Sequence, residues 1–251
     1  MRPPASISLS FWAAVLASAL TICSPRMAVA EEVDLQLLLA IDVSPSVDSG
    51  EYALQIHGLA DALRNPEVID AISTAAPNGV AMALMQWAGP REQVLSVGWS
   101  EVRDQMSAEA FAAKIVAVER PVTNGGTSIG DAMARGIALF SESDFRGNRQ
   151  VMDISGDGST NLGNSPAPVR VRAVSLGMTV NGLVILNEER DLHDYYFRRV
   201  IGGPGAFVMH IENFDDFARA IRLKLIREIM VAAVSNSLPD PVLGSDPRSM
   251  Q

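Results

Sequence analysis

Residues 35–46 read Leu-Gln-Leu-Leu-Leu-Ala-Ile-Asp-Val-Ser-Pro-Ser. A continuous apolar run that ends abruptly in polar side chains is typical of a β-strand buried on both faces. Its carboxyl end carries Asp42, Ser44 and Ser46 at alternate positions. Because extended backbone directs alternate side chains to one side, these oxygen groups can converge on one point. Hard oxygen ligands suit Mg²⁺, so the strand end is predicted to supply half of a divalent-cation site.

Apolar runs and helical patterns alternate along the rest of the chain. Further strands are predicted at residues 80–87, 93–99, 149–154, 178–185 and 206–210. Helices are predicted at residues 48–64, 67–75, 108–118, 127–140, 169–176 and 192–201, with a long final helix after Asn213. This alternation indicates one α/β domain of the doubly wound, Rossmann-like kind. Its central sheet is predicted to be mostly parallel, with residues 93–99 as one antiparallel edge strand and helices on both faces.

The first thirty residues predict export from the cytoplasm. Arg2 precedes an apolar stretch at residues 7–23, and Ala-Val-Ala at residues 28–30 matches a signal peptidase site. The stretch is too short and wrongly flanked for a membrane span, although an uncleaved anchor is the less favoured alternative. We therefore expect a signal peptide at residues 1–30, a folded domain at 31–235 and a flexible tail at 236–251. The product is expected to be secreted, in the periplasm.

Composition excludes several classes of function. The only cysteine, Cys23, lies in the predicted signal peptide, so the mature domain has neither disulfide nor thiolate chemistry. Removal of that segment with its two arginines changes the net charge from −9 to −11, whereas a nucleic-acid-binding protein needs a basic face. No later segment is apolar for long enough to span a bilayer. His57, His193 and His210 are scattered and have no accompanying nucleophile, so catalysis by them is not expected.

Two later motifs can complete the cation site. Residues 124–128 (Asn-Gly-Gly-Thr-Ser) form a glycine-rich loop that places a hydroxyl at a helix start. The predicted strand at 149–154 is followed by Ser-Gly-Asp-Gly at residues 155–158. Ligand sites in a doubly wound sheet form outside the carboxyl ends of the strands. The candidate metal ligands are therefore Asp42, Ser44, Ser46, Thr127 and Asp157.

These motifs, in this order, resemble the metal-ion-dependent adhesion site (MIDAS) of von Willebrand factor type A (VWA) domains, and the resemblance covers residues 33–234. It most resembles the secreted bacterial single-domain members. The resemblance implies that Ser44, Ser46 and Thr127 bind the metal through their hydroxyls, with Asp42 and Asp157 acting directly or through water. It also implies a protein partner whose acidic side chain completes the octahedron. We expect Mg²⁺, with Mn²⁺ or Ca²⁺ as alternatives.

The chain departs from the family pattern at two positions. Gly156 stands where the family usually has threonine, and Pro45 removes a backbone donor between the two serines. Neither change removes a ligand, but both are expected to alter the geometry of the loops and the metal affinity. Two further acids lie near the motifs. Asp131 is interpreted as a solvated helix residue. Asp153, inside a predicted buried strand, is expected to hydrogen-bond to backbone or to support the metal loops.

This pattern of residues is compatible with three functions. The favoured one is a metal-dependent protein-binding module with no enzymatic activity. A metal-assisted hydrolase is the second, but no general base with a nucleophile accompanies the motifs. The third is a scaffold with a vestigial site. A haloacid-dehalogenase-type phosphotransferase needs a second carboxylate where Ser44 stands, and a phosphate loop needs a lysine that residues 124–128 lack.

Overall fold

The structure, a computed structural model, describes residues 30–121 and 124–236. The predicted signal peptide, apart from Ala30, and the predicted tail beyond Asn236 lie outside the described residues. Within the described part, no helix is long and apolar enough to cross a membrane.

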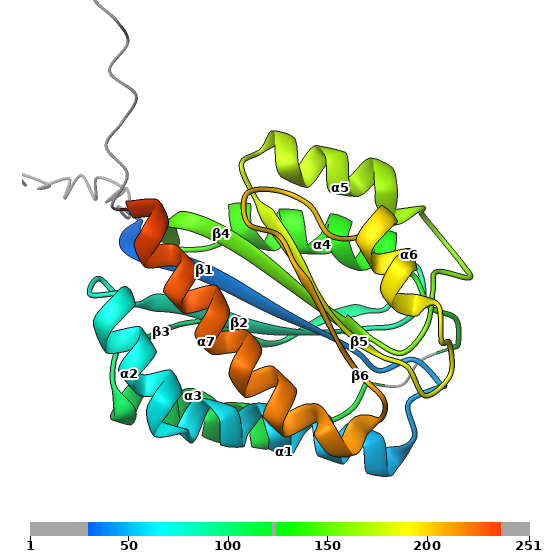
Figure 1. The fold of residues 1–251 in the computed structure, drawn as a ribbon, viewed down its shortest axis with the longest axis horizontal. Coiled ribbons are helices and arrows are strands. Elements are labelled where there is room, and N and C mark those ends of the chain that lie inside the picture. Colours follow the sequence, from blue (N-terminus) through cyan, green and yellow to red (C-terminus); the bar gives the residue numbers. More distant parts are fainter. Residues whose placement is uncertain (1–29, 122–123, 237–251) are drawn as a thin grey trace, which may run out of the picture.

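A six-stranded sheet in the order β3-β2-β1-β4-β5-β6 forms the centre of the domain (Figure 1). Neighbouring strands pair in parallel except β2 and β3, which are antiparallel. The predicted doubly wound sheet with one antiparallel edge strand is therefore confirmed. The strands are β1 (Glu31–Asp42), β2 (Val80–Trp87), β3 (Gln93–Val102), β4 (Phe145–Gly156), β5 (Thr179–Ile185) and β6 (Val208–Ile211).

Helices cover both faces of the sheet (Figure 1). One face carries α1 (Ser49–Arg64), α2 (Pro66–Ala75), α3 (Gln105–Val116) and α7 (Phe217–Asn236), the last preceded by a short 3₁₀ turn at Phe214–Asp216. The other face carries α4 (Ile129–Ser141), α5 (Pro166–Ser175) and α6 (Leu192–Arg199).

Strand β1 lies at the centre and packs against both helical layers. Leu37 and Leu39 belong to the apolar cluster under α1 and α7, whereas Leu38 and Ala40 belong to the cluster under α4 and α6. This division follows from the alternation of side chains along a strand. Burial on both faces explains why the strand reads as an unbroken apolar run rather than as an alternating one.

Element boundaries differ from the sequence predictions where tertiary contacts decide them. Strand β4 begins at Phe145 rather than at residue 149, because its polar first half pairs with β1 from Glu31 onward. Helix α4 begins at Ile129 rather than at Thr127, whose N–H donates to the Asn161 side chain outside the helix. The charged and polar residues of these segments gave no local sign of either contact.

Candidate metal centre

The strands β1 and β4 end side by side at one edge of the sheet. Ile41 pairs with Ser155, so Asp42 and Asp157 leave the sheet from adjacent positions. Both side chains are fully buried. Two carboxylates that are far apart in the sequence therefore share one water-excluded region at the carboxyl ends of parallel strands, where doubly wound folds form their ligand sites.

A chain of hydrogen bonds connects four of the five candidate residues. Asp42 Oδ1 accepts a hydrogen bond from the Ser44 backbone N–H, with a donor–acceptor distance of 2.7 Å. The hydroxyl oxygens of Ser44 and Ser46 lie 3.0 Å apart. Ser46 Oγ then donates to Asp157 Oδ1 over 2.8 Å. The alternate spacing read from the sequence thus places oxygen atoms in mutual contact, with Ser46 on the exposed side of the group.

Thr127 lies at the same edge without joining that chain directly. Its N–H donates to Asn161 Oδ1 over 2.8 Å, and the N–H of the next residue, Ser128, donates to the Ala88 carbonyl over 2.9 Å. Ala88 follows the end of β2, and Asn161 belongs to the loop after β4. Thr127 is buried between these two segments, and no hydrogen bond links it to the other four candidates among the described residues.

The glycine-rich loop nevertheless lies close to the loop that follows β1 (residues 43–48), here named the serine loop. A Cβ atom built on Gly125 would lie 4.0 Å from Pro45 Cγ. Gly125 has a φ of 103° and Gly126 a φ of 90°, both in the left-handed region that favours glycine. The two glycines therefore give the backbone the turn that brings the Thr127 segment toward the strand ends.

Each of the two buried carboxylates has one oxygen without a partner. Among the described residues, no hydrogen bond reaches Asp42 Oδ2 or Asp157 Oδ2. Buried polar atoms are almost always paired, because leaving one unpaired forfeits its interaction with water. A cation between the carboxylates and the hydroxyls would satisfy both atoms, so the residues present fit a divalent metal.

The electrostatics of the centre also favour a cation. Burial, and then repulsion from the Asp157 carboxylate, raise the pKa of Asp42 to about 7. Burial likewise raises the pKa of Asp157 above its ordinary value. In the described ranges, no cluster of three or more His, Cys, Asp or Glu side chains could hold a metal ion. A centre here would therefore be built mostly from hydroxyls, with two carboxylates.

Close packing explains the glycine that replaces the family's usual threonine. A Cβ atom on Gly156 would lie 2.9 Å from Tyr196 Oη, 3.0 Å from Asp42 Oδ2 and 3.3 Å from Trp87 Cζ2. A threonine would therefore collide with buried neighbours. Pro45 is exposed, and the turn around it is closed by the Val47 N–H, which donates to the Ser44 carbonyl over 3.1 Å.

Arg120 holds the serine loop, and it belongs to none of the sequence motifs that predict the metal site. Its Nη2 lies within hydrogen-bond distance of the carbonyl oxygens of Val43 (3.1 Å), Ser44 (3.0 Å) and Val47 (2.6 Å). Its guanidinium also lies 5.4 Å from the centre of the Tyr52 ring. One planar cation thus fixes several carbonyls of the loop that follows β1. The contact spans more than seventy residues of sequence, so no local pattern could reveal it.

Asp131 has a different role from the predicted one. It is half-buried, and its Oδ2 accepts hydrogen bonds from Ser128 Oγ (2.5 Å) and from the Asn164 N–H (2.9 Å). It therefore joins the start of α4 to the loop that follows β4. The interpretation as a solvated helix residue was wrong, because a distant backbone donor reaches this carboxylate.

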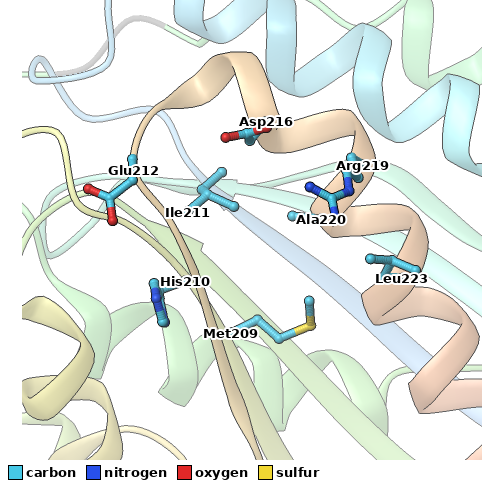
Figure 2. Close-up of a pocket in the computed structure, with 8 residues that line it drawn as sticks. All are labelled: Met209, His210, Ile211, Glu212, Asp216, Arg219, Ala220 and Leu223. Carbon is cyan, nitrogen blue, oxygen red and sulfur yellow. The ribbon is translucent and has the colours of Figure 1, made fainter.

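A separate pocket lies beside the edge strand β6 and the start of α7 (Figure 2). Met209 and Ile211 point toward α7, whereas His210 and Glu212 point to the opposite side of the strand, as alternation requires. None of the five candidate metal ligands lines this pocket. The pocket is lined by Met209, His210, Ile211, Glu212, Asp216, Arg219, Ala220 and Leu223.

The packing around Gly156 leads to a stability prediction. The Gly156→Ala variant is expected to lower the free energy of unfolding by about 1–3 kcal/mol, because the new methyl group must displace Tyr196, Asp42 or Trp87. The matched control is Gly158→Ala, since an added Cβ there meets no atom within 4 Å. Urea unfolding of the two variants measures the difference. Equal stability of both would contradict the described packing.

The raised pKa of Asp42 predicts how stability depends on pH in the metal-free protein. In the unfolded chain this carboxyl ionises near its ordinary pKa of 3.8, whereas in the folded domain it stays protonated up to about 7. Folding stability should therefore fall as the pH rises through this window and level off above it. Urea unfolding in EDTA at a series of pH values measures the effect. Asp42→Asn should flatten this part of the profile, and an unchanged slope in the variant would refute the assignment.

Solved structures of other proteins identify the fold. Proximal thread matrix protein 1 from the mussel byssus matches with a TM-score of 0.56 and 16% identity, over 80% of this chain and 47% of that one. A structure of the same protein with a zinc-occupied MIDAS motif matches with a TM-score of 0.56 and 16% identity, over 78% and 46%. A von Willebrand factor type A structure from Catenulispora acidiphila gives a TM-score of 0.52 and 17% identity, over 78% and 42%.

At these identities the likeness shows the fold alone, and that fold is the VWA fold. The chain spans about half the length of the mussel protein it matches. No curated protein sequence matches the chain. A family model does match it, over residues 32–233, which is most of the chain. This chain therefore belongs to the family described as "Protein of unknown function (DUF1194)".

Proposed function

We propose that this protein is a metal-ion-dependent binding module that uses a divalent cation to capture an acidic side chain of a partner protein. The proposed ligands of the cation are Asp42, Ser44, Ser46, Thr127 and Asp157. The observation that carries the proposal is the pair of unpartnered, buried carboxylate oxygens, Asp42 Oδ2 and Asp157 Oδ2, beside a chain of contacting hydroxyls.

The chemistry of the proposed ligands explains why the cation would bind a further ligand from outside the chain. Three of the five proposed side chains are neutral hydroxyls, and Asp42 is held partly by the Ser44 N–H. A divalent ion with few direct carboxylates keeps much of its charge and attracts an anionic oxygen from outside. Because Ser46 is exposed, an incoming carboxylate could approach from its side.

Magnesium is the proposed metal, with Mn²⁺ or Ca²⁺ as alternatives. Carboxylate and hydroxyl oxygens suit these ions, whereas zinc prefers nitrogen and sulfur ligands. The zinc in the MIDAS motif of the mussel matrix protein supports a divalent metal in general. When bound, the ion would supply an electrophilic point for the partner's carboxylate, while the chain's own hydroxyls and Arg120 hold the geometry.

Binding is favoured over catalysis. Among the described residues, the groups that hydrogen-bond to Asp42, Ser44, Ser46 and Asp157 are hydroxyls, amides, carboxylates and the Arg120 guanidinium, and no histidine is among them. A metal-assisted hydrolase would need a general base within reach of a bound nucleophile. The matching structures include a byssus matrix protein and a pilus adhesin, which agrees with a role in protein contacts. Export to the periplasm is proposed from the sequence of residues 1–30.

Titration with Mg²⁺ and Mn²⁺ tests the metal site. Isothermal calorimetry should show binding of one ion by the wild-type protein, its loss in Asp42→Ala, and an affinity at least about tenfold weaker in Thr127→Ala. The matched control is Ser49→Ala, which removes an exposed hydroxyl just beyond the serine loop. Absence of binding in the wild-type protein, or equal binding by Asp42→Ala, would contradict the proposal and favour a vestigial site.

Replacement of Arg120 tests whether the serine loop is held in a binding geometry. Arg120→Met should weaken Mg²⁺ binding by about 10- to 100-fold, as is typical when a group that orients metal ligands is lost. The control is Arg91→Met, which removes an exposed arginine from the β2–β3 loop. Circular dichroism confirms that both variants fold. Wild-type affinity in a folded Arg120→Met would show that the loop does not need this cation.

A further inference from the structure

A cluster of ionisable side chains is buried between the middle of the sheet and helix α7, apart from the candidate metal centre. Lys224 on α7 places Nζ 2.7 Å from Asp153 Oδ1 on β4 and 2.5 Å from Glu228 Oε1 on the next turn of α7. The exposed fractions of the Lys224, Asp153 and Glu228 side chains are 0%, 3% and 0%. The prediction that Asp153 bonds to backbone or supports the metal loops was wrong, because a lysine from the last helix reaches it.

The surroundings of the cluster are largely apolar. Lys224 Nζ lies 5.1 Å from the centre of the Phe207 ring, and Leu225 and Ile229 are fully buried neighbours on α7. The Asn181 side-chain amide donates to Glu228 Oε1 over 2.7 Å and so orients that carboxylate. Water is excluded from all three ionisable side chains, and the burial of charge without water carries a large desolvation free energy.

The lysine–aspartate contact differs from an ordinary buried ion pair. Although Nζ lies 2.7 Å from Oδ1, neither oxygen of Asp153 has a hydrogen-bond partner of acceptable geometry among the described residues. Burial, and then the carboxylate of Glu228, act to raise the pKa of Asp153, while Lys224 lowers it, and the result is about 7. The carboxylic acid form of Asp153 is therefore accessible near neutral pH.

We propose that Lys224 and Asp153 join in an intramolecular isopeptide bond, with Glu228 as the proton shuttle. Three features support this reaction: an amine in contact with a carboxyl group, a second carboxylate in contact with the same amine, and exclusion of water. Positioning of the reacting atoms at contact distance in an enclosed site is what accelerates reactions of this kind. The bond would be a modification of the core and is independent of metal binding.

The atoms of the reaction balance without a further reagent. Glu228 transfers one proton from the Lys224 ammonium to the Asp153 carboxylate, which leaves a neutral amine beside a carboxylic acid. The amine nitrogen attacks Cγ of Asp153 and forms the C–N bond. Glu228 then carries a second amine proton to the departing hydroxyl, the C–O bond breaks, and one water molecule leaves. The product is a secondary amide whose remaining N–H can donate to Glu228.

The bond would replace two buried charges with a neutral amide and would fasten α7 to the central strand β4. The folded domain lacks disulfides, because the only cysteine of the chain is Cys23. A covalent link between β4 and α7 would therefore be the domain's own cross-link. It would also close the long loop from Asp153 to Lys224, which limits the freedom of the unfolded chain.

Mass spectrometry of the purified full-length product tests the proposal. After incubation at neutral pH, the denatured wild-type protein should be lighter by one water molecule than its sequence, counted from its measured N-terminus. Proteolysis should yield a branched peptide that joins Lys224 to Asp153. The chain has only two lysines, Lys114 and Lys224, so an amine-reactive label in denaturant should modify Lys114 and spare Lys224.

Two variants separate the proposed chemistry from general effects of substitution. Glu228→Gln should keep the full mass and expose Lys224 to the label, because the shuttle is absent. Lys114→Met, which removes the exposed lysine, should still lose one water molecule. A wild-type protein of full mass, with Lys224 labelled in denaturant, would overturn the proposal whatever the variants do. Loss of water in Glu228→Gln would overturn the role of Glu228.

Discussion

The candidate site depends on the burial of two carboxylates, Asp42 and Asp157, at the ends of neighbouring parallel strands. Each is fully buried, and each keeps one oxygen that no described group satisfies. Without compensation, this arrangement is unfavourable, since burial and mutual repulsion both penalise the ionised forms. The hydroxyls, the glycine-rich loop and the Arg120 guanidinium all lie near these two carboxylates. A divalent cation is the simplest group that would satisfy their unpaired oxygens.

The fold and the three motifs were predictable because their signals are local. The apolar run before Asp42 indicates a strand buried on both faces, and the alternation of Asp42, Ser44 and Ser46 follows from extended backbone. The glycines before Thr127 mark a turn that other residues would strain. These short-range patterns also carry the resemblance to VWA domains, which the structural comparisons bear out at the level of the fold.

The remaining features depend on contacts between distant segments, and the sequence carries no local sign of them. Arg120 meets carbonyls of the serine loop only after the sheet has assembled. The need for glycine at position 156 arises from Tyr196 and Asp42, which approach it from different elements. The partner of Asp153 could not be predicted either, because the lysine that contacts it lies on the last helix, far away in the sequence.

The domain deals with buried charge in two different ways. At the carboxyl ends of the strands, Asp157 accepts a hydrogen bond from exposed Ser46, and no described cationic side chain forms an ion pair with Asp42 or Asp157, which suits an ion that enters from solvent. In the middle of the sheet Asp153 faces a lysine of the same chain, which suits a permanent internal partner. The proposed binding function therefore belongs to the carboxyl ends of the strands, whereas the proposed cross-link belongs to the core.

Crystals grown with Mn²⁺ would test the central claim most directly, through the anomalous scattering of that ion. The account predicts one strong anomalous peak bounded by the oxygens of Asp42, Ser44, Ser46, Thr127 and Asp157, and no comparable peak elsewhere in the domain. A structure in which the Mn²⁺ lies elsewhere, or in which Asp42 Oδ2 and Asp157 Oδ2 stay unpaired at saturating Mn²⁺, would contradict it.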